Sequence, residues 1–191
     1  MHNVSSFFKG PTNFVLSAVY EKYYPNVAFP EIAFIGRSNV GKSSLINSLF
    51  NKKIALISNT PGKTKQVNFF NHSDKLMVVD LPGYGFAKIS KKEAKNISDF
   101  VSHYLSSRKN LKKLFLLIDN SLGAKSIDLD TLKSMGHMRE KIIIVFTKKD
   151  KKIKEISEKN NLIKSNYENY VVSSKNNEGI FDLQKIIFGL L

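Results

Sequence analysis

From residue 31 onward, short apolar runs alternate with amphipathic stretches, and this alternation restricts the fold more than any other feature. Several apolar runs contain almost no polar residue, as strands covered on both faces do. We expect strands at residues 32–35, 67–70, 76–79, 114–118, 142–146 and 170–172. Helical patterns cover residues 43–50, 97–105, 127–138, 153–165 and 180–188. Strands alternating with helices imply right-handed crossovers, so we predict a three-layer α/β domain with a mostly parallel sheet.

The first 29 residues lack this pattern and are punctuated by Pro11 and Pro25. We expect them to form a loop-like N-terminal strap on a single domain that spans residues 30–191. Residues 1–20 contain no acidic residue, which is a weak sign of a targeting peptide. They also contain no arginine, and the next motif starts only sixteen residues later, so the strap is the favoured interpretation.

The sharpest motif is G-x-x-x-x-G-K-[ST], which follows the expected strand 32–35 and opens the expected helix 43–50. Its residues are Gly36, Arg37, Ser38, Asn39, Val40, Gly41, Lys42 and Ser43. Glycines allow backbone N–H groups to curl around phosphate oxygens, and the helix N-terminus adds partial positive charge. Lys42 can reach the β- and γ-phosphates of a nucleotide, and the Ser43 hydroxyl can ligate Mg²⁺.

A second motif, Asp80-Leu81-Pro82-Gly83, follows the expected strand 76–79. On its own, D-x-P-G is a turn signature. At the end of a buried strand that follows a phosphate-binding loop, Asp80 can hold Mg²⁺ through water. The N–H of Gly83 can then reach a γ-phosphate.

A third motif selects the base. Thr147, Lys148, Lys149 and Asp150 follow the expected strand 142–146, and Val172, Ser173 and Ser174 end the last one. Asp150 can accept hydrogen bonds from both N1–H and the exocyclic amine of guanine, whereas adenine offers no such pair of donors. The alkyl part of Lys148 can cover the face of the base. The three motifs in this order predict binding of GTP rather than ATP.

The chain carries 30 basic and 16 acidic residues, which gives a net charge of +14, and only three of the basic residues are arginines. Lysine attracts phosphate as a point charge, so this excess favours a polyanionic partner, such as nucleic acid, over sequence-specific recognition. The alternative is a codon bias, because the chain also holds 18 Asn. The absence of cysteine excludes a disulfide scaffold and fits a reducing compartment. No apolar run is long enough to span a membrane.

These motifs resemble the EngB-type (YihA/YsxC) GTPases of the TrmE–Era–EngA–YihA–Septin-like group. The resemblance covers roughly residues 28–190, and its narrow markers are Thr60-Pro61-Gly62-Lys63-Thr64 and Asp80-Leu81-Pro82-Gly83-Tyr84-Gly85. It implies a G domain with a six-stranded sheet whose second strand is antiparallel to the rest. It further implies a cytoplasmic, monomeric GTP-binding switch that acts in assembly of the large ribosomal subunit. Growth and normal cell division, including septation, would then depend on it.

The resemblance also assigns roles to individual residues. Thr64 would complete the coordination of Mg²⁺ together with Ser43 and Asp80, and Lys42, Thr64 and Gly83 would serve hydrolysis. The residues expected to line the nucleotide next to this threonine are Gly62, Lys63, Thr64, Lys65 and Gln66. The chain departs from the family at Asn120 and Ser121, where Arg and His are common, so a role tied to those side chains is in doubt.

Two residues bear on the rate of hydrolysis. Ras-like enzymes carry a water-orienting Gln just after D-x-x-G, but this chain has Tyr84, which predicts slow intrinsic hydrolysis and dependence on a partner. Asn39 is either a K⁺-holding residue, as in similar GTPases, or an Asn that stabilises its own turn. Two other functions stay open at this point: a basic RNA-binding module with a structural nucleotide, and a small ATP-dependent kinase.

Overall fold

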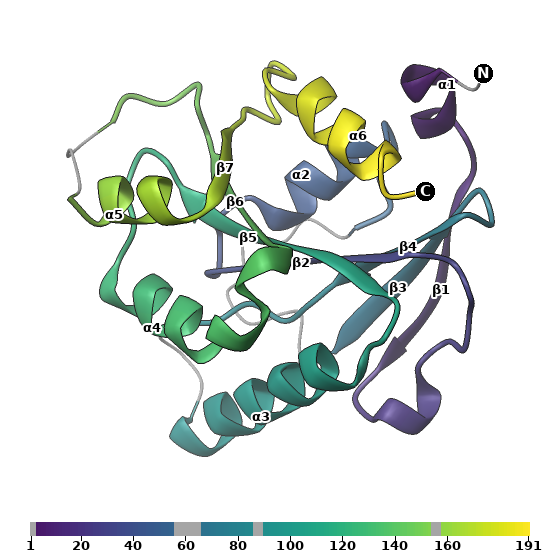
Figure 1. Ribbon diagram of the computed structural model, residues 1–191, viewed down its shortest axis with the longest axis horizontal. Helices are drawn as coiled ribbons and strands as arrows, with labels where there is room; N and C mark the ends of the chain where they lie inside the picture. The colour runs from purple at the N-terminus through teal and green to yellow at the C-terminus, as the bar shows by residue number, and fades with distance from the viewer. Residues whose placement is uncertain (1–2, 56–65, 86–89, 154–157) are drawn as a thin grey trace.

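The computed structural model describes residues 3–55, 66–85, 90–153 and 158–191. The strands in these ranges are β1 (Thr12–Ala18), β2 (Glu31–Gly36), β3 (Val67–His72), β4 (Leu76–Asp80), β5 (Leu111–Asp119), β6 (Ile142–Thr147) and β7 (Glu168–Val171). The helices are α1 (Val4–Phe8), α2 (Lys42–Leu49), α3 (Lys91–Ser107), α4 (Ser126–Ser134), α5 (Glu158–Asn166) and α6 (Ile180–Phe188), with short 3₁₀ segments η1 (Glu21–Tyr23) and η2 (Gly136–Lys141). The strands form one sheet in the order β1-β3-β4-β2-β5-β6-β7 (Figure 1).

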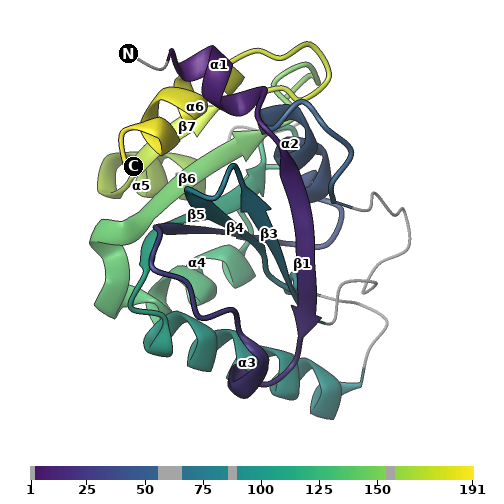
Figure 2. The same ribbon diagram turned by 90° about the vertical axis from the view of Figure 1, so that its right-hand side faces the viewer.

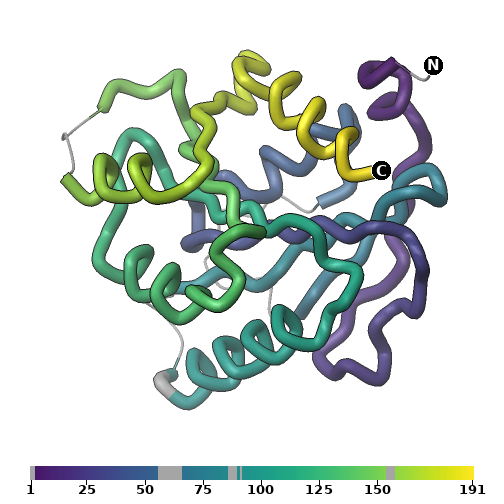
Figure 3. Tube along the Cα trace, in the orientation of Figure 1, coloured from purple at the N-terminus to yellow at the C-terminus, as the bar shows by residue number. Residues whose placement is uncertain are grey.

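The predicted three-layer α/β architecture is confirmed. Alternate residues of β2 point to opposite faces, with Ala33 and Ile35 in one core and Ile32 and Phe34 in the other. The first core includes residues of α3, α4 and α5, and the second includes residues of α1, α2 and α6. Figures 1 and 3 show these helices on the two sides of the sheet. All six expected strands are present at the expected places.

The prediction of six strands is wrong, because the described residues form a seven-stranded sheet. The additional strand, β1, lies antiparallel beside β3 at the edge of the sheet (Figure 2). Only its two end residues, Thr12 and Ala18, are buried, and its apolar run, Phe14 to Leu16, is only three residues long, so the pattern that marks the other strands is weak here. The expectation of one antiparallel strand holds for β3, which runs opposite to both β1 and β4.

The N-terminal segment is held to the sheet by His72, which is fully buried at the end of β3. Its Nδ1 lies 2.8 Å from the hydroxyl of Thr12, and its Nε2 lies 2.9 Å from the carbonyl oxygen of Phe7. Burial lowers the pKa of His72, so the neutral ring is favoured. Residues 4–18 include helix α1 and strand β1, so the expectation that this segment is loop-like is wrong. The division between a strap at 1–29 and a domain at 30–191 stays a prediction.

The expected helix at 127–138 is split. Helix α4 ends at Ser134, and the 3₁₀ segment η2 begins at Gly136, a residue type that disfavours a continuing helix. Helix α3 is longer than its apolar periodicity suggested, because the hydroxyl of Ser90 caps it by accepting a hydrogen bond from the N–H of Glu93 at 3.1 Å. Within the described ranges, no helix combines the length and apolar character needed to cross a bilayer.

Candidate functional site

The expected motifs meet at the carboxyl ends of the parallel strands. The phosphate-binding loop follows β2, the Asp80 motif follows β4, and the Thr147 motif follows β6. Segment 172–174 follows β7, which lies beside β6. Ligands of open α/β sheets bind at this edge, so the topology itself brings the candidate residues together.

The phosphate-binding loop has the backbone geometry that its glycines permit. A Cβ atom on Gly36 would lie 2.9 Å from the carbonyl oxygen of Leu117, which leaves no space for a side chain there. Gly41 has a φ of 102° and is the N-cap of α2, so the N-cap residue supplies no side-chain hydrogen bond to the helix start. Within the described residues, the first-turn N–H groups of α2 thus lack an N-cap side chain, which suits a helix that binds phosphate.

The Nζ atom of Lys42 contacts Oδ1 of Asp80, and both side chains are largely buried. Lys42 begins α2, and Asp80 ends β4, so this ion pair joins two of the three motifs. Leu81, Pro82 and Gly83, which follow Asp80 in the sequence, are buried as well. The Asp80 carboxylate and the Ser43 hydroxyl are oxygen groups of the kind that Mg²⁺ prefers as ligands.

The third motif supports the phosphate-binding loop from the side. The hydroxyl of Thr147 donates a hydrogen bond to the carbonyl oxygen of Val40 at 2.6 Å. Lys148 has a φ of 61°, and its Nζ donates to the carbonyl oxygen of Asn39 at 2.8 Å and to Oδ2 of Asp119 at 2.6 Å. The Lys148 ammonium and the Ser121 hydrogen bonds hold the pKa of Asp119 below its usual value, against the effect of burial. The base-reading motif and the loop are thus linked by two hydrogen bonds, and Lys148 is also tied to the end of β5.

The carboxylate of Asp150 is oriented by the segment after β7. The hydroxyl of Ser173 donates to Oδ1 of Asp150 at 2.6 Å, and this hydrogen bond lowers the pKa of Asp150. The N–H of Lys149 donates to the carbonyl oxygen of Val172 at 3.0 Å. Asp150 is exposed and remains ionised at neutral pH, as an acceptor for two guanine donors must.

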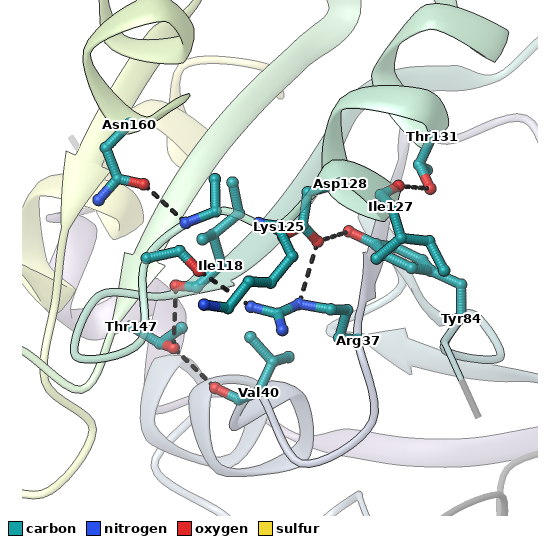
Figure 4. A network of polar contacts seen from close by, with 12 residues as sticks. Arg37, Val40, Tyr84, Ile118, Lys125, Ile127, Asp128, Thr131, Thr147 and Asn160 are labelled. Carbon is teal, nitrogen blue, oxygen red and sulfur yellow. Dashed lines mark hydrogen bonds and ion pairs between the residues drawn. The ribbon is translucent and has the colours of Figure 1, made fainter. Parts of the chain in front are cut away.

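Arg37 and Tyr84 lie next to one another and point toward α4 (Figure 4). The N–H of Ser38 donates to the carbonyl oxygen of Tyr84 at 3.2 Å, and the N–H of Tyr84 donates to that of Gly36 at 3.3 Å. The phenol of Tyr84 donates to Oδ1 of Asp128 at 2.8 Å. The side chain of Tyr84, which stands where Ras-like enzymes carry the water-orienting Gln, is therefore hydrogen-bonded to a residue of helix α4.

Four of the expected site residues, Gly62, Lys63, Thr64 and Lys65, lie outside the described residues. Gln66 is exposed just before β3, and Ser174 follows Ser173 after β7. Asn39 is exposed with a φ of 63°, a conformation that Asn tolerates. This geometry agrees with either interpretation of Asn39. The remaining expected residues lie in the three motifs or in the segment after β7, where the structure brings them to one edge of the sheet.

Sequence reasoning missed two acids at this edge. Asp119 pairs with Lys148, and Asp128 lies 3.1 Å from Nε of Arg37. Asp128 also caps the start of α4, because its Oδ2 accepts the N–H of Lys125 at 2.7 Å. No local pattern revealed its second role, since Arg37 is 91 residues away in the sequence.

Comparisons with known proteins point to a family of GTPases. A family model described as a 50S ribosome-binding GTPase matches residues 31–148. The chain is 44% identical over 184 residues to the probable GTP-binding protein EngB of Rickettsia bellii, which covers 93% of this chain and 87% of the relative. It is 43% identical over 175 residues to the protein of that name from Thermotoga maritima, which covers 88% of this chain and 90% of the relative.

A crystal structure of a probable GTP-binding protein engB superposes on the chain with a TM-score of 0.69 and 26% sequence identity, covering 84% of this chain and 97% of that one. The fold is thus that of a P-loop GTPase, and the family shows that the chain is a GTP-hydrolysing enzyme. The order of motifs, the arrangement at the sheet edge and these similarities lead to one conclusion: the chain belongs to the EngB family of GTP-binding proteins, a class of ribosome-biogenesis GTPases.

Proposed function

We propose that this protein binds Mg²⁺–GTP at the carboxyl edge of the sheet and hydrolyses it slowly. The contact between Lys42 and Asp80 carries the proposal, because a buried ammonium and a carboxylate meet beside the uncapped start of α2. The loop residues Gly36 to Ser43 would hold the phosphates. Leu81 and Pro82 would shape the turn that brings Gly83 to the γ-phosphate.

The metal would be held by Ser43, Asp80 and Thr64, and bound Mg²⁺ supplies charge neutralisation on the phosphate oxygens. Lys42 would stabilise negative charge that develops during transfer, and the N–H of Gly83 would orient the terminal phosphate. Residues Gly62 to Gln66 would close over the nucleotide. Tyr84 cannot supply the paired amide donor and acceptor of a Gln, and its phenol already donates to Asp128. Slow intrinsic turnover follows.

Guanine would be read by Asp150, covered by the stem of Lys148 and bordered by Thr147, Lys149 and segment 172–174. The test is Asp150→Asn, which should weaken GTP binding and shift preference toward xanthine nucleotides. The matched control is Asp182→Asn, which makes the same change at an exposed residue of α6. Retained GTP affinity in the Asp150 variant would contradict the assignment.

K⁺ is a further proposed cofactor, held by Asn39 at the phosphate-binding loop. Its exposed side chain supports this, since a ligand can reach it. Hydrolysis measured in K⁺ and in Na⁺ buffers decides the matter: faster turnover in K⁺, lost in Asn39→Ala, is the expected result. Equal rates would leave Asn39 as a residue of the turn.

The cellular role we propose is that of a cytoplasmic, monomeric switch in assembly of the large ribosomal subunit, needed for growth and for normal cell division and septation. The net charge of +14 supports an RNA-rich partner. Sedimentation with large-subunit precursors should show more bound protein in GTP than in GDP, and the particles should speed hydrolysis. Rapid turnover that the particles do not change would contradict the switch. Function that survives Ser43→Ala and Asp80→Asn would instead favour an RNA-binding module with a structural nucleotide.

A further inference from the structure

One buried carboxylate, that of Asp128, connects three segments of the site. Its side chain is fully buried in the first turn of α4. Oδ2 accepts the N–H of Lys125, and Oδ1 accepts the phenol of Tyr84 and lies 3.1 Å from Nε of Arg37. Figure 4 shows Arg37 and Tyr84 converging on this carboxylate from two different segments. Asp128 therefore joins α4 to the phosphate-binding loop and to the motif that ends in Gly83.

The two contacts on Oδ1 differ in kind. The phenol of Tyr84 makes a hydrogen bond of 2.8 Å, whereas Nε of Arg37 is buried without a hydrogen bond of good geometry in the described part of the chain. Arg37 thus contributes charge, and its Nη2 is held by the carbonyl oxygen of Gly123 at 3.2 Å. Burial and the adjacent Asp128 keep the pKa of Tyr84 well above its usual value, so the phenol remains a donor.

Backbone hydrogen bonds link Tyr84, and with it the Asp128 contact, to the phosphate-binding loop. Tyr84 is paired with Arg37 in a parallel bridge, and the two hydrogen bonds of that bridge fix the residue that follows Gly83. Gly85 lies against the same side chains, because a Cβ there would sit 3.5 Å from Ile127 and 3.7 Å from the stem of Arg37. The segment after Gly83 is thereby seated on the start of α4. A buried charge that lost these partners would be costly, which favours one arrangement.

We propose that Asp128 is a positioning residue of the GTPase site, which holds the Gly83–Tyr84 peptide in register with the phosphate-binding loop so that it meets the third phosphate of GTP. The inference rests on the proposed role of Gly83. GDP has no third phosphate, so it gains nothing from this register. Asp128 therefore sets the preference for GTP over GDP without touching either nucleotide.

The test is Asp128→Asn, in which the remaining amide oxygen can still accept the N–H of Lys125 but the acceptor for the Tyr84 phenol and the negative charge toward Arg37 are lost. Affinities for GDP and for a non-hydrolysable GTP analogue are measured by fluorescence titration. We expect about a tenfold loss for the GTP analogue, the loss of one hydrogen bond to a charged group, and little change for GDP. Asp130→Asn, an exposed acid on the same helix, is the matched control and should change neither affinity.

Tyr84→Phe removes the same hydrogen bond from the other side and keeps the ring. It should lower affinity for the GTP analogue in the same direction, and the double variant should lose little more than Asp128→Asn alone. Equal losses for both nucleotides, a tighter complex with the GTP analogue, or additive losses would each overturn the proposal. If the unaltered protein binds neither nucleotide, the proposed function fails instead, so the two failures are distinguishable.

Discussion

Two buried ion pairs lie at opposite ends of the central strands, and they are built differently. At the amino end of β2, both oxygens of Glu31 are bonded: Arg108 donates through Nε at 3.1 Å and Nη2 at 2.6 Å, and the phenol of Tyr104 also donates. At the carboxyl end of β4, Asp80 meets Lys42, and in the described part of the chain only Oδ1 has a recorded contact.

Glu31 and Arg108 form a closed pair, in which several protein groups bind both oxygens of the carboxylate. Lys42 and Asp80 form an open pair, for which the described residues supply a single contact. Arg108 also donates to the carbonyl oxygen of Pro25 and lies over the rings of Tyr24 and Phe69, so protein groups surround this cation. Lys42 and Asp80 have only each other as partners in the described part of the chain, and under the proposed function phosphate and Mg²⁺ would replace this contact. We therefore expect comparable burial of a charge pair to serve stability at one end of the sheet and, under the proposed function, ligand binding at the other.

The largest expected effect is on the closed pair. Arg108→Met leaves the Glu31 carboxylate buried without its cation, so the free energy of unfolding should fall by about 3–5 kcal/mol. Chemical denaturation measures this loss, with Arg139→Met as the control because Arg139 is exposed. A loss no greater than that of the control would show that the cluster is not the structural anchor described here.

The open pair should respond in the opposite way. Lys42→Ala should slow GTP hydrolysis by about 10²–10³-fold, the usual effect of removing one donor that stabilises transition-state charge. The unfolding free energy should fall less than for Arg108→Met, because Asp80 loses one contact with its cation, whereas Glu31 loses two hydrogen bonds from Arg108. Single-turnover hydrolysis and denaturation of the same preparation measure both. Large loss of stability with turnover intact would reverse the comparison.

The position of these motifs at the strand ends could be predicted because their signals are local, and the roles of their residues stay predictions. The loop from Gly36 to Ser43 and the acid at Asp80 are short motifs next to buried apolar runs, and each occupies the position expected for it. Strands covered on both faces are visible in a single sequence for the same reason.

Features that depend on distant partners were not predictable. β1 pairs with β3, and its apolar run is only three residues long with Phe14 and Val15 exposed, so little in the sequence marks it as a strand. Lys148 reaches Asp119 across neighbouring strand ends, and Asp128 reaches Arg37 from another layer. Folding brings these residues together from distant parts of the chain. Their spacing in the sequence therefore does not reveal the contacts.

A smaller effect is expected where the base-reading motif supports the loop. Thr147→Val keeps the shape of the side chain but leaves the carbonyl oxygen of Val40 without its donor, at a cost of about 1–2 kcal/mol. Val40 belongs to the loop that would hold the phosphates shared by GDP and GTP. The affinities for both nucleotides should therefore fall together, whereas Asp128→Asn should lower only the affinity for GTP. Thr147→Ser retains the hydroxyl and should restore both. A loss confined to GTP would place Thr147 with the γ-phosphate group instead.

The smallest expected effect is a pH dependence of stability, at the end of the sheet that holds the Glu31–Arg108 pair. His72 lies there, paired across β3 and β4 with Leu76, and its pKa is lowered in the folded protein. The unfolded chain therefore binds the proton more readily, so stability is complete above the ordinary histidine pKa of about 6.5 and declines as pH falls below it. Hydrogen exchange should then rise first in residues 4–18, which His72 holds through Thr12 and Phe7, while GDP affinity changes little. His72→Gln should remove the pH step, and a step of equal size in that variant would assign it to another group.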